Sequence, residues 1–131
     1  MQTSSLERYL LRVEEKLKEL EPLISSSQIS IERRSINRVV LKGTIVFIDG
    51  SSLRFLEYVL EEDNRLFRVS YRFHYISQDG SLIFRYDNAP HHPELSTFPH
   101  HKHLPGGIVV PSSEKSLIDI LDEIKEIAHR E

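Results

Sequence analysis

The chain has 131 residues, which is enough for one domain with a single hydrophobic core but not for two. Hydrophobic residues make up 39% and charged residues 28%, a composition typical of folded globular proteins and not of disordered chains. The absence of cysteine excludes a disulfide scaffold, a thiolate-bound metal centre and catalysis by a thiol. The net charge of −3 argues against uniform affinity of the whole surface for nucleic acid.

The two ends of the chain have the periodicity of amphipathic helices. A helix is predicted over residues 4–20, with Ser4 or Ser5 as the N-cap and Pro22 ending it. Its apolar positions are Leu6, Leu10, Val13, Leu17 and Leu20. A second helix is predicted over residues 113–129, introduced by a serine N-cap. Its apolar face comprises Leu117, Ile120, Leu121, Ile124, Ile127 and Ala128.

The N-terminal segment carries charges where a signal peptide needs an apolar centre. No apolar run approaches the roughly 18 residues that span a bilayer. We therefore expect a cytoplasmic protein with no membrane partner.

Between the helices, residues 28–87 alternate as β-strands do and are interrupted by turn signals. Strands are predicted over residues 28–34, 38–48, 53–60, 66–76 and 82–87. The turns contain Asp49-Gly50 and Asp79-Gly80, where glycine accepts a positive φ without a steric penalty. Because the connections are short, consecutive strands are expected to pair antiparallel.

Residues 88–107 contain four of the six prolines and five of the seven histidines, so a helix interior or a central strand is not expected there. A short strand is predicted over residues 107–110. The predicted fold class is α+β, in one domain covering residues 1–131. It is an antiparallel β-meander flanked by an N-terminal and a C-terminal helix that cover one sheet face. A long His/Pro-rich loop over residues 88–107 follows the last main strand.

The middle of the chain differs from the rest in charge and in histidine content. Six of the seven histidines lie between His74 and His103, and residues 65–103 carry five Lys and Arg against three Asp and Glu. Alternation in the strand over residues 66–76 predicts one apolar face, which the helices would cover: Phe67, Val69, Tyr71, Phe73 and Tyr75. The opposite, polar face would carry Arg68, Arg72, His74, Arg85 and Asp87, beside the histidines of the loop.

This combination fits a metal-independent ribonuclease. Histidine titrates near neutral pH and can act as general acid or base, and arginine clamps phosphate oxygens. The candidate acid–base residues are His74, His91, His92, His100, His101 and His103. The candidate RNA- and phosphate-binding residues are Arg68, Arg72, Arg85, Lys102 and Tyr75, the last by stacking on an unpaired base. No cofactor is expected.

Glu57 is a further candidate, because it lies in the apolar register of Leu53 and Phe55. A buried carboxylate needs a partner, and Arg72 or Arg85 is expected to provide it. Glu57 is then either half of a structural ion pair or a catalytic carboxylate.

Other interpretations of the histidines stay open. The same loop, with Asp87 and Glu94, could hold a metal ion in a metal-dependent hydrolase or nucleotide-modifying enzyme, although its spacings match no strong metal motif. Alternatively, the loop recognises a partner in a non-catalytic binding module. The arginines could also lie on an ordinary solvated sheet face, and single histidines could hydrogen-bond the loop backbone.

Three blocks of the chain resemble the TumE family, whose members are regarded as toxins of type II toxin–antitoxin modules. The blocks are Tyr71-Arg72-Phe73-His74-Tyr75, the segment Phe84-Arg85-Tyr86-Asp87-Asn88-Ala89-Pro90-His91-His92-Pro93, and Thr97-Phe98-Pro99-His100-His101-Lys102-His103-Leu104-Pro105. The resemblance implies a growth-inhibiting toxin that a cognate DNA-binding antitoxin neutralises by direct contact. The expected partners are this antitoxin and, from the chemistry of the histidines and arginines, an RNA substrate. A homodimer is also expected.

Overall fold

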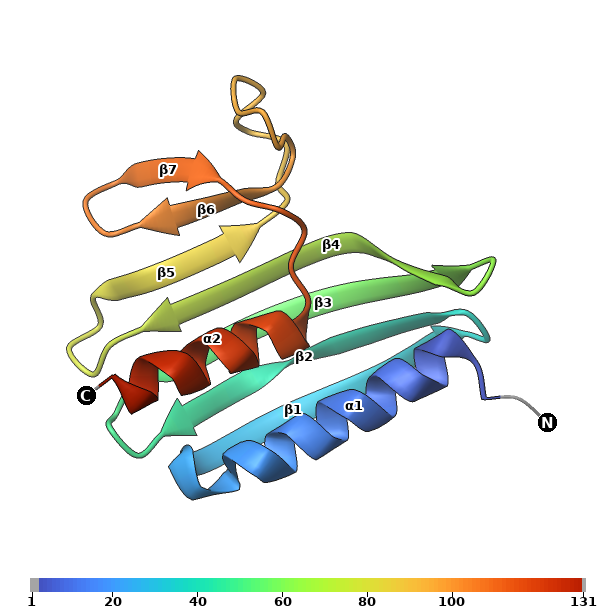
Figure 1. Cartoon of the computed structure of the whole chain (residues 1–131), viewed down its shortest axis with the longest axis horizontal. Coiled ribbons are helices and arrows are strands. Elements are labelled where there is room, and N and C mark those ends of the chain that lie inside the picture. The colour runs from blue at the N-terminus through green and yellow to red at the C-terminus, as the bar shows by residue number, and fades with distance from the viewer. Residues whose placement is uncertain (1–2, 131) are drawn as a thin grey trace.

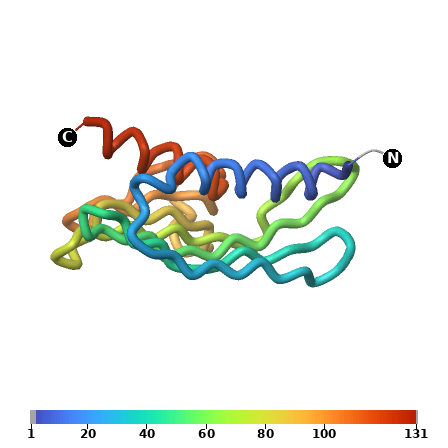
Figure 2. The backbone as a smooth tube through the Cα atoms, turned by 90° about the horizontal axis from the view of Figure 1, so that it is seen from below, coloured from blue at the N-terminus to red at the C-terminus, as the bar shows by residue number. Residues whose placement is uncertain are grey.

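The computed structural model describes residues 3–130 and consists of one seven-stranded antiparallel sheet with two helices. The strands follow the order β1-β2-β3-β4-β5-β6-β7, so every strand pairs with its neighbours in the sequence. Both helices lie on the same side of the sheet and leave its other face open (Figures 1 and 2). This arrangement confirms the predicted α+β meander flanked by an N-terminal and a C-terminal helix.

The elements have the following bounds. The helices are α1 (Ser5–Leu20), a 3₁₀ turn η1 (Glu21–Leu23) and α2 (Leu117–His129). The strands are β1 (Ile24–Ser35), β2 (Arg38–Phe47), β3 (Ser52–Glu62), β4 (Arg65–Ile76), β5 (Leu82–Asp87), β6 (His101–Leu104) and β7 (Ile108–Pro111).

Capping side chains set where both long helices begin. Ser4 caps α1 by accepting a hydrogen bond from the Glu7 backbone N–H at 3.1 Å. Ser116 and Asp119 form a capping box at the start of α2. The predicted start of the second helix at residue 113 is therefore wrong by four residues, because Ser116 and not an earlier serine provides the cap.

Two strand predictions also need correction. β1 begins at Ile24 and not at residue 28, because the serine-rich segment that follows the first helix also pairs with β2. The predicted loop over residues 88–107 is too long, because His101–Leu104 forms β6 and pairs with β5 and β7. No proline lies inside these four residues, so nothing prevents them from forming a strand ladder. The irregular segment is residues 88–100, which extends from β5 beside β6 and β7 (Figure 1).

The hydrophobic core lies between the helices and the covered face of the sheet. The aromatic side chains of β4 and β5 form its centre, and α1 and α2 close it from above (Figure 2). Its aromatic members are Tyr9, Phe47, Phe55, Tyr71, Phe73, Tyr75, Phe84 and Tyr86. Burial of this apolar surface holds the helices on the sheet.

A β-bulge in β4 reverses the faces predicted for the first half of that strand. Tyr58 pairs with Ser70 and Val59 pairs with Arg68, so Val69 is an extra residue in β4. Before the bulge, Phe67 and Val69 are 45% and 50% exposed, whereas Arg68 turns toward the helices. The alternation predicted for Tyr71, Phe73 and Tyr75 is confirmed, but Phe67, Val69 and Arg68 lie on the opposite sides from those predicted.

Neither helix within residues 3–130 is long and apolar enough to cross a membrane.

Candidate functional site

The open face of the sheet is hollowed into a basic groove over β1–β4. The groove has a volume of about 1220 Å³ and is lined by residues that include Lys42, Arg54, Leu56, Arg72 and His74. Lys42 is paired with Glu32 at 3.2 Å, but Arg54 and Arg72 form no ion pair within residues 3–130. The cationic side chains that line the groove make it suited to a negatively charged ligand.

At one end of the groove, a row of alternating arginine and histidine crosses four strands. Arg54 of β3 pairs with His74 of β4, His74 pairs with Arg85 of β5, and Arg85 pairs with His103 of β6. Side chains at directly paired positions point to the same face of a sheet. We call Arg54, His74, Arg85 and His103 the Arg–His row.

His74 is the member of the row with an unused nitrogen. Its Nδ1 is buried and has no hydrogen-bond partner within the described residues 3–130. Burial lowers the pKa of His74, and the positive charges of Arg72, Arg85 and Arg54 lower it further. His74 is therefore neutral at neutral pH, the form in which an imidazole can accept a proton.

This environment predicts a pH dependence of stability. Because the pKa of His74 is lower in the folded than in the unfolded chain, the unfolded chain binds more protons below about pH 6.5. The contribution of neutral His74 to the free energy of unfolding is thus fully present above about pH 6.5. It is lost as the pH falls toward the pKa of His74 in the folded chain. Denaturant unfolding at pH 7.5 and 5.5 should show a larger loss on acidification in the wild type than in His74→Asn. An equal loss in the two proteins would contradict this prediction.

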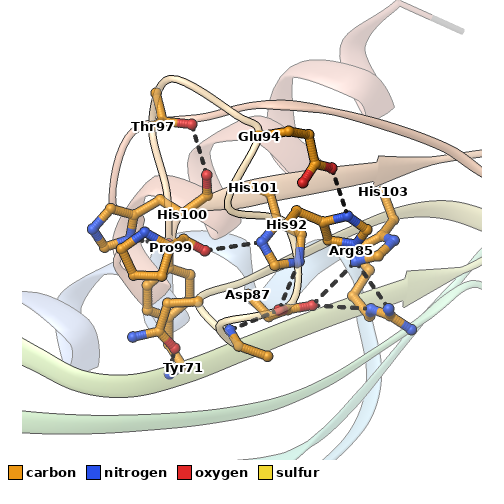
Figure 3. Close-up of polar contacts among 12 residues, drawn as sticks. Tyr71, Arg85, Asp87, His92, Glu94, Thr97, Pro99, His100, His101 and His103 are labelled. Atoms are coloured by element: carbon orange, nitrogen blue, oxygen red, sulfur yellow. Dashed lines mark hydrogen bonds and ion pairs between the residues drawn. The ribbon is translucent and has the colours of Figure 1, made fainter.

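Asp87 connects the Arg–His row to the loop (Figure 3). Its carboxylate accepts a hydrogen bond from Arg85 Nε at 3.2 Å and another from the Ala89 backbone N–H at 3.0 Å. Arg85 Nη2 also donates to His103 Nε2 at 3.0 Å. Burial and the Arg85 charge lower the pKa of His103, whose Nε2 must be unprotonated to accept from the guanidinium. Asp87 is buried and holds Arg85 in place.

Three histidines gather around Asp87. His101 is only 2% exposed, and its Nε2 lies 2.9 Å from Asp87 Oδ1. His103 Nε2 lies 3.4 Å from Asp87 Oδ2. The ring of His92, from the loop, lies 5.0 Å from that of His101 and 5.9 Å from that of His103, centroid to centroid. We call His92, His101 and His103 the histidine cluster (Figure 3).

The remaining candidate histidines lie outside this cluster. His100 Nδ1 is 2.9 Å from the Tyr71 hydroxyl, and the two rings are stacked. His91 is exposed, and its one hydrogen bond within residues 3–130 runs from its backbone N–H to the Ala89 carbonyl. The structure therefore divides the adjacent pairs His91-His92 and His100-His101, placing one member of each in the cluster.

Glu57 forms a buried polar junction on the covered side of the sheet. The fully buried carboxylate accepts hydrogen bonds from the Tyr9 hydroxyl at 2.7 Å, Arg68 Nε at 2.9 Å and the Leu117 backbone N–H at 3.2 Å. Burial raises the pKa of Glu57, while Arg68 and the hydrogen bonds act in the opposite direction.

The partner expected for Glu57 was Arg72 or Arg85, and that prediction is wrong. The β4 bulge turns Arg68 to the covered side instead, while Arg72 and Arg85 stay on the open face. The resulting junction links α1, β3, β4 and the start of α2.

Two further RNA-binding candidates also lie away from the open face. Tyr75 is buried in the aromatic core, where its ring contacts Phe47 and Phe84. Lys102 points to the helix side, where Nζ lies 4.8 Å from the centroid of the Tyr86 ring. Of the predicted phosphate-binding residues, the structure brings Arg72 and Arg85 together with His74.

Sequence reasoning missed two cationic groove residues, Lys42 and Arg54. Arg54 alternates with buried Leu53 and Phe55 in a correctly predicted strand, so alternation alone could have placed it on the open face. Lys42 gives no such signal, because it follows three consecutive buried residues. Nothing in the sequence indicated that Arg54 would pair directly with His74.

Comparison with known proteins identifies one relationship. The family model described as Toxin TumE matches residues 13–128, which is most of the chain. No curated protein and no solved structure matches the chain.

Proposed function

Since the chain belongs to the TumE toxin family, we propose that it is the toxin of a type II toxin–antitoxin module and that it cleaves RNA on the open face of its sheet. In this proposal the reaction is a metal-independent endoribonuclease reaction. The observation that carries the proposal is the Arg–His row beside the basic groove.

Such a reaction needs a base, an acid and a cation around one phosphate. The base removes the proton of a ribose 2′-OH, whose oxygen attacks the adjacent phosphorus. The bond to the 5′-oxygen breaks, and the acid protonates this leaving oxygen. The products are a 2′,3′-cyclic phosphate and a 5′-OH end. The reaction therefore balances without a metal ion or a redox partner.

The row and the neighbouring histidine of β6 supply these groups in order across the sheet. His74 is neutral, which is the protonation state that a general base requires. Arg85, on the next strand, stabilises the charge that builds on the phosphate oxygens. Of the two histidines of β6, His101 provides the acid, because His103 accepts a hydrogen bond from Arg85 through an unprotonated Nε2. The backbones of β4 and β6 are about 10 Å apart, which leaves room for a phosphate over β5.

The basic groove supports binding of the RNA strand on the β1–β4 side of this site. Arg54 and Arg72 are positioned to contact neighbouring phosphates, and within residues 3–130 neither helix covers the face on which they lie. Both helices occupy the other side, so an extended single strand can reach the groove without displacing them (Figure 2).

Membership of a toxin family implies an antitoxin partner. We propose that this partner is a cognate DNA-binding protein that neutralises the toxin by direct contact.

The direct test uses toxin that was produced with its antitoxin, purified without a His tag and treated with EDTA. We expect it to cleave single-stranded RNA in the presence of the chelator and to leave 2′,3′-cyclic phosphate ends. RNA that stays intact, while expression of the chain alone still arrests growth, would overturn the ribonuclease proposal but not the assignment as a toxin.

RNA binding is expected to depend on the groove arginines. The variant Arg54→Gln/Arg72→Gln should bind 2′-O-methylated single-stranded RNA, which cannot be cleaved, more weakly than the wild type. The slope of log affinity against log salt should fall by about 0.7 for each lost phosphate contact. Arg12→Gln, on the exposed side of α1, is the matched control and should keep the wild-type slope. An unchanged slope in the double variant would place the RNA elsewhere.

A second candidate function is a metal-dependent hydrolase or nucleotide-modifying enzyme, which the histidine cluster favours. The same assay distinguishes the two, because only a metal-dependent enzyme loses its activity in EDTA and regains it when the metal is restored.

A further inference from the structure

We propose that the histidine cluster, together with Asp87, is a binding site for a divalent transition-metal ion such as Zn²⁺. The potential ligand atoms of His92, His101 and His103 all lie within 4.8 Å of one another. His101 and His103 are on the same face of β6, and His92 reaches them from the 88–100 loop (Figure 3). This inference concerns metal binding and does not depend on RNA being the substrate.

The distances between donor atoms approach those of a coordination shell. Zinc–nitrogen bonds of 2.0–2.1 Å in a tetrahedral site place neighbouring donors about 3.3 Å apart. Asp87 Oδ1 is 2.9 Å from His101 Nε2, and Asp87 Oδ2 is 3.4 Å from His103 Nε2. Asp87 on β5 and His101 and His103 on β6 are therefore already spaced almost as metal ligands are. A movement of the loop that carries His92 would complete the site.

The outer nitrogens of two histidines have the partners that metal-bound histidines usually have. A ligating histidine generally donates its other N–H to a carboxylate or a backbone carbonyl, which orients the ring. His92 Nδ1 lies 3.2 Å from Glu94 Oε1, and His101 Nδ1 lies 2.9 Å from the Pro99 carbonyl oxygen. These contacts leave Nε2 of both rings directed toward the centre of the cluster (Figure 3).

The chemistry of the donor set narrows the choice of ion. Imidazole nitrogen and one carboxylate oxygen suit Zn²⁺ and its neighbours in the first transition series. Mg²⁺ and Ca²⁺ prefer sites built from oxygen ligands. A set of three imidazoles and one carboxylate is thus selective for a transition metal.

The positive charge of Arg85 disfavours binding of a metal ion to the histidine cluster. Its guanidinium donates to His103 Nε2 and to Asp87, the atoms that the metal would take as ligands. Its side chain is 29% exposed, so it has room to turn away from the cluster. Metal binding therefore has to displace a positive charge, and removing that charge should strengthen binding.

The test is a calorimetric titration of metal-free, untagged protein with Zn²⁺. We expect one ion per chain, and substitution by Co²⁺ should give the visible absorption bands of a tetrahedral site. His92→Asn and His103→Asn should each weaken binding more than about 100-fold, and Glu94→Gln about 10- to 100-fold. His91→Asn is the matched control from the same loop and should bind as the wild type does.

A final variant distinguishes this site from adventitious capture by surface histidines. Arg85→Gln should bind Zn²⁺ at least about tenfold more tightly than the wild type, because a neighbouring positive charge is gone. No binding by the wild type, or equal binding by wild type and His92→Asn, would overturn the proposal. Because the readout is binding alone, loss of the ribonuclease proposal would leave this result intact.

Discussion

Replacing Glu57 with alanine is expected to lower the free energy of unfolding by about 3–5 kcal/mol, because it leaves a buried charge without its partner. Arg68 would keep its position beside the core with no carboxylate to pair with, since its side chain is only 11% exposed. The Tyr9 hydroxyl and the Leu117 backbone N–H would lose their acceptor as well. Denaturant unfolding measures the loss directly.

A paired substitution separates the structural role of Glu57 from a catalytic one. Glu57→Leu/Arg68→Met removes both charges and should recover the part of the stability that Glu57→Ala loses by leaving Arg68 unpaired. If the junction is only structural, this double variant should remain toxic when expressed. A stable double variant without toxicity would show instead that Glu57 or Arg68 takes part in the activity.

The largest expected effect on activity comes from His74→Ala. Removing the proposed general base should lower the rate of RNA cleavage by about 10²- to 10⁴-fold. The folded state should change little, because the ring lies on the open face and its Nδ1 makes no hydrogen bond within residues 3–130. The measurement is the initial rate of cleavage of a single-stranded RNA in the presence of EDTA.

Two comparisons make this prediction specific. Added imidazole should restore part of the activity of His74→Ala, because it can take the proton in place of the lost ring. His129→Ala, at the end of α2, is the control and should cleave RNA at the wild-type rate. Cleavage by His74→Ala at the wild-type rate would rule out His74 as the base and leave the role to another group.

Local hydrophobic patterns in the sequence predicted much of the fold. Alternation predicted β2, β3, β4 and β5 within a few residues, because each has one apolar face that the helices cover. The helices were predicted from their apolar spacing, and Ser4 was one of the two proposed caps of α1. The strand at His101–Leu104 escaped prediction because prolines and histidines surround it and it is only four residues long.

The faces of side chains were predictable only where the strands pair without interruption. His74, Arg72 and Arg85 were placed on the open face correctly, because alternation holds in that part of β4 and β5. The bulge at Val69 shifts the first half of β4 by one residue and carries Arg68 to the other side. A single extra residue in one strand leaves no recognisable signal in the sequence.

The sequence by itself determined that this protein has a meander with one apolar face and that its histidines concentrate beside its only net-basic segment. These are local properties, set by alternation and composition. Tertiary structure alone decided which histidines meet, since His92, His101 and His103 converge only when β6 pairs with β5 and the loop folds back on Asp87. It also decided that Glu57 pairs with Arg68, because strand register depends on pairing between strands and not on either strand alone.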